Sequence, residues 1–340
     1  MMRKTVFCLL TLIMVAVMAD AQTRLVKEHR QKEFPEHIPA GNYSGITWLG
    51  EDEYAVVSDK AKDGFLIFKI SIDPNTGVIK NATLKERKEN GNNGRDAEDI
   101  AFFPSKKTLF VVGESDNQAR EYDLNGKRTG RMLKMPKRFL NAGGKYGVES
   151  VTYNGNTHRF WITTESTLKA DGQQAAGGSN TKNRLRLQAF TEDLQPAGQY
   201  LYEMDAPVAK NKSTRYAMGC SALTALDNGD LLVMEREFYV PNGKLGAFVN
   251  SKIYCVHPQK ENKVAGDAAW NKEKVLKKQL ICQWRTSLGL FVQSIANFEG
   301  MCLGPKLSNG DQVIVLVADS QDQYGGVLCD WLKTIVIKSE

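Results

Sequence analysis

Oxygen-bearing side chains recur at matching positions in five stretches of this 340-residue sequence. Each stretch begins with Ser or Glu, continues through an apolar run, a turn and a second apolar run, and ends on an acidic residue. The first position is occupied by Ser44, Glu98, Glu149, Ser221 and Glu299. The last position is occupied by Asp59, Glu114, Glu165, Glu235 and Asp319. If the five stretches surround one axis, these residues form an inner ring and an outer ring.

The inner ring would place three carboxylates close together, which is costly unless they are protonated, solvated or neutralised by a cation. A ring of hard oxygen ligands suits Ca²⁺, which takes roughly 6–8 oxygens, better than Mg²⁺, which prefers a small octahedral shell. Zinc is disfavoured because the four histidines show no ligand spacing and no Cys/His cluster is present. We therefore predict Ca²⁺ bound by the inner ring. The alternative is that these acids are solvated strand ends or bond to neighbouring strands.

The outer ring could supply a general base, with Glu235 or Glu165 as the first candidates and Asp59, Glu114 and Asp319 as further ones. Four cations lie near these positions in the sequence: Lys60, Arg95, Arg120 and Arg236. An Arg side chain matches a phosphate group through its two-pronged donor geometry. We predict that these four residues bind an anionic substrate. Surface ion pairing is the alternative role for each of them.

The elements that must position these residues are β-strands. In each stretch two apolar runs flank a turn such as Asp227-Asn228-Gly229, which is typical of a β-hairpin. Two further strand-like runs follow the hairpin, for example residues 65–72 and 78–84 in the first unit. Repeated units of four antiparallel strands predict an all-β fold, a β-propeller with five blades.

The last unit has only one further run, residues 333–338, before the sequence ends. We expect residues 23–33 to supply its fourth strand and close the ring, which would protect the exposed edges. The alternative is a six-bladed propeller with a blade in residues 167–218 or 237–297. Residues 168–181 are rich in Gly, Gln, Ala and Ser, which predicts a loop, and one interpretation is a lid over the site.

The N-terminus has the features of a secretory signal peptide. Arg3 and Lys4 precede an apolar run over residues 6–18, and Ala19-Asp20-Ala21 matches a cleavage site. We therefore predict a signal peptide over residues 1–21, a single domain over residues 22–340, and export to the periplasm or the medium. No second segment is long and apolar enough to predict a membrane span.

Composition limits the partners. Hydrophobic residues make up 42% and charged residues 25%, as in ordinary globular proteins. A net charge of +6, dispersed along the chain, does not indicate nucleic-acid binding. We expect a monomer that acts on a small anionic substrate. Five cysteines follow the signal peptide without a C-x-x-C motif, so we expect buried free thiols, with a pair between Cys255 and Cys282 as the alternative.

The sequence resembles the phytase-like family of secreted propellers, also described by esterase-like activity of phytase. The similarity lies in Gly147-Val148-Glu149-Ser150-Val151, in residues 222–236, in Ser251-Lys252-Ile253-Tyr254 and in residues 297–305. The order Ser, Glu, Glu, Ser, Glu in the inner ring is also similar to the calcium site of the five-bladed, calcium-dependent apyrases. The first resemblance implies phosphoester hydrolysis, and the second implies a central Ca²⁺.

Three functions remain open at this stage. The first is a metal-dependent hydrolase of phosphate esters or anhydrides. The second is a non-catalytic propeller with a structural ion that binds a ligand or partner, and the third is a lactonase-like hydrolase. Motifs of histidine phosphatases, cysteine phosphatases, α/β-hydrolases and P-loop enzymes are missing from the sequence. Propellers host many activities, so the fold alone does not decide among the three.

Overall fold

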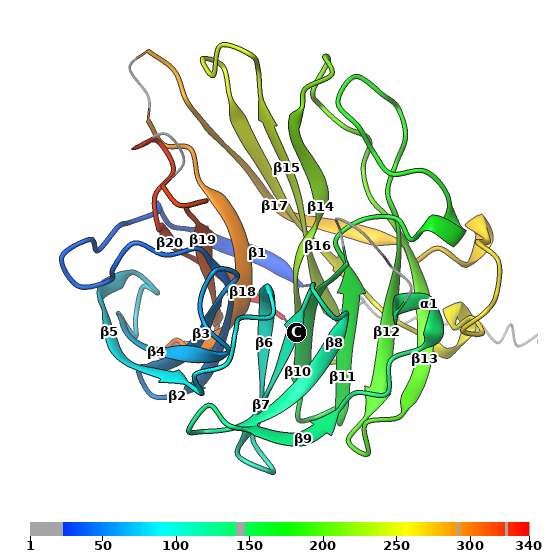
Figure 1. Cartoon of the computed structure of the whole chain (residues 1–340), viewed down its shortest axis with the longest axis horizontal. Helices are drawn as coiled ribbons and strands as arrows, with labels where there is room; N and C mark the ends of the chain where they lie inside the picture. The colour runs from blue at the N-terminus through cyan, green and yellow to red at the C-terminus, as the bar shows by residue number, and fades with distance from the viewer. Residues whose placement is uncertain (1–22, 141–146, 291–292, 324–325, 340) are drawn as a thin grey trace, which may run out of the picture.

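The computed structural model describes residues 23–140, 147–290, 293–323 and 326–339. Five four-stranded antiparallel sheets form the blades of a β-propeller around a common axis (Figure 1). Blade 1 contains β2 (Tyr43–Gly50), β3 (Glu53–Ser58), β4 (Gly64–Ile72) and β5 (Ile79–Glu89). Blade 2 contains β6 (Ala97–Phe103), β7 (Thr108–Gly113), β8 (Gln118–Asp123) and β9 (Arg128–Met132).

Blade 3 contains β10 (Val148–Asn154), β11 (Arg159–Thr164), β12 (Arg184–Thr191) and β13 (Pro196–Glu203). Blade 4 contains β14 (Arg215–Ala225), β15 (Leu231–Val240), β16 (Phe248–Val256) and β17 (Lys278–Ser287). Blade 5 contains β18 (Asn297–Lys306), β19 (Gln312–Asp319), β20 (Leu332–Lys338) and β1 (Arg24–Glu28). In every blade the first strand of the predicted hairpin is innermost, as the repeat pattern requires.

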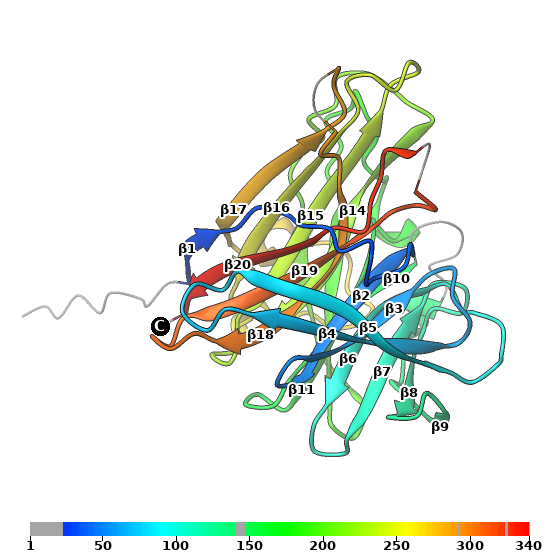
Figure 2. The ribbon, with the colours of Figure 1, turned by 90° about the vertical axis from the view of Figure 1, so that its left-hand side faces the viewer.

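The N-terminal strand closes the ring. β1 pairs antiparallel with β20, from Arg24 opposite Lys338 to Glu28 opposite Ile335, and the two strands lie side by side in Figure 2. The predicted five blades and their N-terminal closure are therefore confirmed, and the six-bladed alternative is wrong. Residues 167–218 and 237–297, where a sixth blade was the alternative, contain strands of the five blades. Apart from these strands, their described residues form only short 3₁₀ helices as regular structure.

Apolar side chains that alternate along the strands pack between neighbouring blades, which builds the core. Between blades 2 and 3, for example, Phe103, Phe110 and Phe160 are buried, with ring centroids 4.7 Å apart for Phe110 and Phe160. Other buried clusters join blade 5 to blade 1 and blade 4 to blade 5. Burial of this apolar surface, at about 25 cal/mol per Å², holds the blades at fixed angles to one another.

The innermost strands nearly touch at the centre. A Cβ atom on Gly45 of β2 would lie 2.4 Å from Cα of Asp99 in β6, and one on Gly300 of β18 would lie 3.0 Å from Cα of Gly45. Only glycine fits at such an approach. On one side of this constriction lie the predicted rings. On the other side the first strands of all five blades line a cavity of about 160 Å³.

The loop of residues 168–181 is anchored along its length. Asp171 forms a fully buried, two-bonded ion pair with Arg186 of β12, at 2.7 Å for both contacts, and a second pair with Arg138 at 2.9 Å. Farther along, Gly178 N donates to the carbonyl of Ala209 at 2.8 Å. The contacts fix this segment to blade 3 and to the chain before β14, which gives no support to the interpretation as a lid.

The predictions on the N-terminus, on membrane spans and on the cysteines can be compared with the described residues. The predicted signal peptide, residues 1–21, lies outside the described residues. Across the described part, no helix has the length and apolar character needed to span a membrane. Cys220, Cys255, Cys282 and Cys302 are buried free thiols, as expected, and Cys329 is a half-buried one, so Cys255 and Cys282 do not form a disulfide.

Candidate metal centre

A β-bulge occurs at the same point of all five blades and defines the inner ring. In blade 1, Tyr43 pairs with Ser58 and Gly45 pairs with Val57, so Ser44 between them has no partner in the register. The same skip occurs in the other four blades. The skipped residues are Ser44, Glu98, Glu149, Ser221 and Glu299. A bulge redirects the side chain of its extra residue, so one repeated backbone feature presents all five predicted inner-ring residues.

The outer-ring residues lie beside the bulge, in the residue pair of the first two strands of each blade that comes one step further from the hairpin turn. Here Asp59 N donates to Asn42 O, Glu114 N to Asp96 O and Glu165 N to Gly147 O, at 3.2, 2.8 and 3.1 Å. In blade 5 the equivalent pair is Asp319 with Asn297. In blade 4 it is Arg236 with Gly219. The structural outer ring is therefore Asp59, Glu114, Glu165, Arg236 and Asp319.

Glu235 lies one register position away from this ring. It pairs with Cys220, and its buried carboxylate lies between blades 3 and 4. There it accepts hydrogen bonds from Tyr202 Oη and Lys278 Nζ, both at 2.6 Å, and from Asp205 N at 3.0 Å. The acid predicted for blade 4 of the outer ring is thus held between blades, and a cation occupies the ring position.

Arg236 bridges two blades of the ring. Its two terminal nitrogens donate to Oε1 of Glu299 and Oε1 of Glu165, and one of them also donates to Asn297 Oδ1 at 3.0 Å. The side chain is only 5% exposed. Charge-assisted bonds of this kind are among the strongest that an Arg side chain forms. Arg236 therefore neutralises part of the ring that blades 3 and 5 provide.

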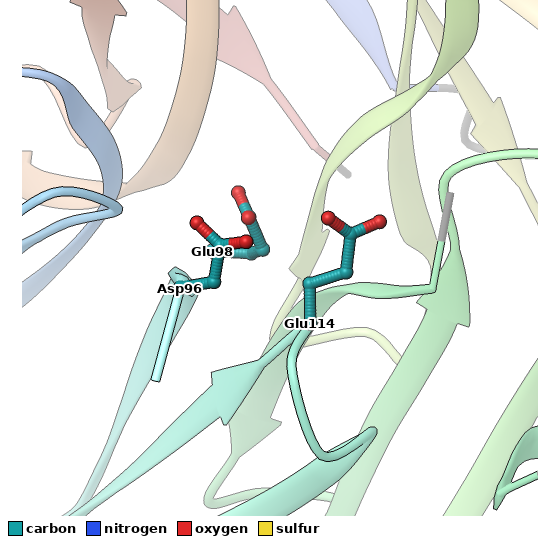
Figure 3. A group of neighbouring side chains, drawn as sticks. All are labelled: Asp96, Glu98 and Glu114. Carbon is teal, nitrogen blue, oxygen red and sulfur yellow. The ribbon is translucent and has the colours of Figure 1, made fainter. Parts of the chain in front are cut away.

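Blade 2 presents three carboxylates that face one another: Asp96, Glu98 and Glu114 (Figure 3). One oxygen from each lies within 4.8 Å of the others, and all three residues are half-buried. Asp96 precedes β6 and has a φ of 55°, a conformation that Asp tolerates better than most residues. The sequence analysis missed Asp96, although it lies two positions before Glu98.

Burial and mutual repulsion raise the pKa values of several buried ring acids. Burial, followed by the charges of neighbouring ring acids, raises the pKa of Glu98 and of Glu149 well above the ordinary value. The pKa of Glu299 is raised in the same way, although Arg236 opposes the shift. Burial raises the pKa of Asp319 to about 6. These directions are what a cluster of acids with too few counter-charges produces.

The donor set fits a hard cation. Eight carboxyl groups meet here, from the inner ring, the outer ring and Asp96, and among the described residues Arg236 and Lys60 are cations that act on them. Two oxygens in this region have no hydrogen-bond partner among the described residues, Ser221 Oγ and Asp59 Oδ1. Ser44 Oγ, by contrast, donates to Ala97 O at 2.5 Å. An oxygen-only set with unsatisfied members is typical of sites for Ca²⁺ or Mg²⁺.

The four predicted substrate cations are not equivalent. Arg95 is buried and donates to both oxygens of Asp116, and Arg120 donates to the same carboxylate at 3.0 Å. Arg236 is held by the ring itself. Lys60 is 60% exposed and lies 2.9 Å from Asp59 Oδ2, so it is the cation that solvent and small molecules reach most easily.

A larger open cavity, of about 860 Å³, lies away from the rings between β16 and residues 257–279. His257 Nδ1 and Cys255 Sγ both contact Asp230 there. Burial and the charge of Asp230 raise the pKa of the Cys255 thiol to about 12, so this thiol is a poor nucleophile. The chemistry of the rings, rather than cavity size, therefore identifies the site.

Comparison with known proteins agrees with this architecture. The model of the phytase-like family, described as esterase-like activity of phytase, matches residues 38–321. The chain belongs to this family. The match covers all five bulges of this phytase-like propeller. A comparison with curated proteins finds no match. These results do not bear on the resemblance of the inner ring to calcium-dependent apyrases.

Several solved structures are similar to this phytase-like chain at low identity. A member of the duf4221 family from Bacteroides vulgatus is 9% identical, with 94% of this chain and 99% of that chain covered and a TM-score of 0.42. A streptogramin B lyase is 14% identical, with 91% and 98% covered and a TM-score of 0.37. A chain of a nidogen/laminin complex is 12% identical, with 83% and 77% covered and a TM-score of 0.39. At these scores the similarities carry no argument about function.

Proposed function

We propose that this phytase-like propeller is an exported, calcium-dependent hydrolase of small anionic esters, with phosphate esters and anhydrides as the first class to test. The observation that carries the proposal is the gathering of eight ring carboxyl groups, beside which the described residues provide the cations Arg236 and Lys60. The family description, which names an esterase-like activity of phytase, supports hydrolysis. The basic and apolar segments before Ala21 support export. We expect the mature chain, residues 22–340, to act as a single domain and a monomer.

The ligands of the ion would come from the inner ring, Ser44, Glu98, Glu149, Ser221 and Glu299, together with Asp96 and Glu114. A bound Ca²⁺ would supply charge neutralisation for an anionic substrate and a fixed point against which it is oriented. Lys60, beside the ring and largely exposed, would contact the same anionic group. Both effects favour a transition state in which negative charge accumulates on the transferring group.

Asp59 is the best placed general base. Lys60 Nζ donates to its Oδ2 at 2.9 Å, and the buried Oδ1 has no hydrogen-bond partner among the described residues, so this oxygen would accept a proton from a water bound against it. Burial raises the pKa of Asp59 above its ordinary value, so its carboxylate is a better base than a solvated one. As the proton moves to Asp59, the water oxygen bonds to phosphorus or carbonyl carbon. The bond to the leaving oxygen then breaks, and that oxygen takes a proton from solvent.

The test uses the mature protein, stripped with a chelator and then supplied with Ca²⁺ or Mg²⁺. Thermal unfolding is followed, and each sample is assayed against p-nitrophenyl phosphate, ATP, phytate and p-nitrophenyl acetate. We expect a calcium-specific rise in Tm and calcium-dependent turnover. Glu98→Gln should lose both, whereas Asp59→Asn should keep the rise in Tm and lose about 100-fold or more in kcat.

Glu192→Gln is the matched control, because this glutamate bonds to Tyr153 and His158 at the end of β12 remote from the ring. It should keep both properties. A protein that holds no metal and does not respond to Ca²⁺ would refute the ion site. A calcium-specific gain in stability without turnover on any of these substrates would refute the hydrolase and favour a binding propeller with a structural ion.

A further inference from the structure

Strand β6 of blade 2 carries a buried carboxylate, Asp99, that the proposed mechanism does not use. The residue is 1% exposed and comes directly after the bulge residue Glu98. Its Oδ1 accepts a hydrogen bond from Ile100 N at 2.8 Å, and its Oδ2 accepts one from Val151 N of β10 at 3.0 Å. One carboxylate therefore joins the innermost strands of blades 2 and 3.

Asp99 also lies against the innermost strand of blade 1. A Cβ atom on Gly45, the residue after the bulge at Ser44, would lie 2.7 Å from Asp99 Oδ1. Val151, the partner in blade 3, comes two positions after the bulge at Glu149. The carboxylate of Asp99 thus lies beside the backbone next to three consecutive inner-ring residues, one in each of blades 1 to 3.

The innermost strands of other blades are joined by neutral side chains that lie farther along the strand. Thr47 Oγ1 of blade 1 accepts a hydrogen bond from Phe102 N of blade 2 at 3.2 Å. Thr152 Oγ1 of blade 3 accepts one from Ala225 N of blade 4 at 3.1 Å. Both threonines come three positions after the bulge residue of their blade, and blade 2 has Ala101 at this position. Blade 2 therefore differs from them both in the position of the junction and in its chemistry.

A buried carboxylate is the costlier group for such a junction, because it loses the hydration of a charge, whereas a threonine hydroxyl loses much less. What Asp99 adds is its place beside the ring. It bonds to the backbone next to Glu98 and next to Glu149, two inner-ring acids whose charges act on each other. A threonine at position 101 would join the same two blades at a greater distance from these acids.

We propose that Asp99 is a positioning residue of the metal centre: its two hydrogen bonds fix the backbone that carries Glu98 relative to the backbone that carries Glu149, so that both carboxylates face one cation. Groups that hold the ligands of a metal site in place typically change metal affinity about 10–100-fold when they are removed. The inference rests on the proposed function only for the presence of a cation at the inner ring. In this role Asp99 contacts neither the ion nor the substrate.

The first measurement compares the binding of Ca²⁺ and Mg²⁺ to chelator-stripped mature proteins by equilibrium dialysis with metal analysis. Asp99→Asn keeps the size of the side chain, but its amide nitrogen cannot accept the second hydrogen bond. It should weaken Ca²⁺ binding about 10-fold or more. Mg²⁺ binding should weaken by a smaller factor, because a less rigid set of ligands adapts more readily to the smaller ion.

Thr152→Val is the matched control, because it removes a junction between blades 3 and 4 that lies farther from the ring. It should weaken Ca²⁺ binding less than about 3-fold and keep the ratio of Ca²⁺ to Mg²⁺ affinity. Both variants should unfold at lower urea concentrations than the wild type in chelator. A purely structural role of Asp99 would therefore change stability in both variants and leave the affinity ratio unchanged in both.

The second measurement uses the wild type alone and does not depend on whether a variant folds. Amide hydrogen exchange is followed by NMR with and without Ca²⁺. A cation held by Glu98 and Glu149 opposes the local opening that breaks the bond from Val151 N to Asp99, so protection of the Val151 amide should rise about 10-fold or more. Protection of the Ala225 amide, which Thr152 holds, should rise less than about 3-fold. Equal rises at the two amides, or an Asp99→Asn protein with the wild-type affinities for both ions, would overturn the inference.

The outcomes separate this inference from the proposed function. A wild type that binds no Ca²⁺ refutes both. A wild type that binds Ca²⁺ but hydrolyses none of the test substrates, together with the expected loss in Asp99→Asn, supports the inference and refutes the hydrolase. Calcium-dependent turnover together with equal Ca²⁺ and Mg²⁺ affinities in Asp99→Asn and the wild type supports the hydrolase and refutes the positioning role of Asp99.

Discussion

The ring carboxyls should make the metal-free protein less stable as the pH rises, and Asp319 allows the size of this effect to be worked out. Its carboxyl group is 1% exposed at the end of β19. Burial raises its pKa from the ordinary value of 3.8 to about 6, with Gln321 opposing the shift and the charge of Asp59 adding to it. The perturbation is Asp319→Asn, which removes the ionisable group and keeps its shape.

The sign follows from the order of the two pKa values. Between pH 3.8 and about 6 the unfolded chain has released this proton while the folded protein still holds it. The folded state therefore binds more protons in this window, so the free energy of unfolding falls as the pH rises. The difference between the two pKa values corresponds to about 3 kcal/mol in total. About 2 kcal/mol of this is lost between pH 4.5 and 7.5. Glu98, Glu149 and Glu299, whose pKa values are also raised, act in the same direction.

The assay is urea unfolding of the mature protein in chelator at several pH values from 4.5 to 7.5. Asp319→Asn should reduce the loss of stability across this range by about 2 kcal/mol relative to the wild type. Asp73→Asn is the control: hydrogen bonds lower the pKa of Asp73 below its ordinary value, so its titration lies below this range and the slope should not change. Stability that rises with pH in the metal-free wild type, or an Asp319→Asn protein with the wild-type slope, would refute the reasoning.

Two further predictions concern the frame that holds the site. Gly45→Ala places a methyl group 2.4 Å from Cα of Asp99 and should destabilise the protein by about 2 kcal/mol or more, whereas Gly243→Ala, with nothing within 4 Å, should be neutral in urea unfolding. Arg186→Leu removes the two-bonded partner of the buried Asp171 carboxylate, which then has only its single contact with Arg138, and should cost about 3 kcal/mol. The double variant with Asp171→Leu should cost less than either single change, and strict additivity in the cycle would contradict this.

The blade pattern could be predicted from the sequence because strand pairing here is local. Each hairpin joins runs that are adjacent along the chain, and the turn residues mark where one run ends. Because the last unit lacked a fourth strand, residues 23–33 were predicted to supply it, and β1 (Arg24–Glu28) is the fourth strand of blade 5. The ends of the strands were predicted less accurately than their number. β14 begins at Arg215 and β15 ends at Val240, both outside the apolar runs, because the two strands continue to pair with each other there.

The site could be predicted only in part, and the reason lies in the register. In the sequence, Glu235 is the acid that follows the second apolar run of the fourth repeat, and it was therefore assigned to the outer ring. Ser221 and Arg236 are separated by fifteen positions, as are Ser44 and Asp59, so this spacing was the available signal. Asp96 carried no such signal, because its neighbour Arg95 turns away to Asp116 and nothing in the sequence tells which of the two faces Glu98.

The sequence by itself determined the number of blades, their order and the closing strand, because these depend on apolar periodicity and turns that each repeat carries within itself. It also determined the inner ring, since one position recurs in all five repeats. Only the tertiary structure decided that a bulge presents each of these residues, that Arg236 replaces a carboxylate in the outer ring, and that Asp96 joins Glu98 and Glu114. These features depend on contacts between blades distant along the chain, where burial and charge rather than local pattern determine which side chains meet.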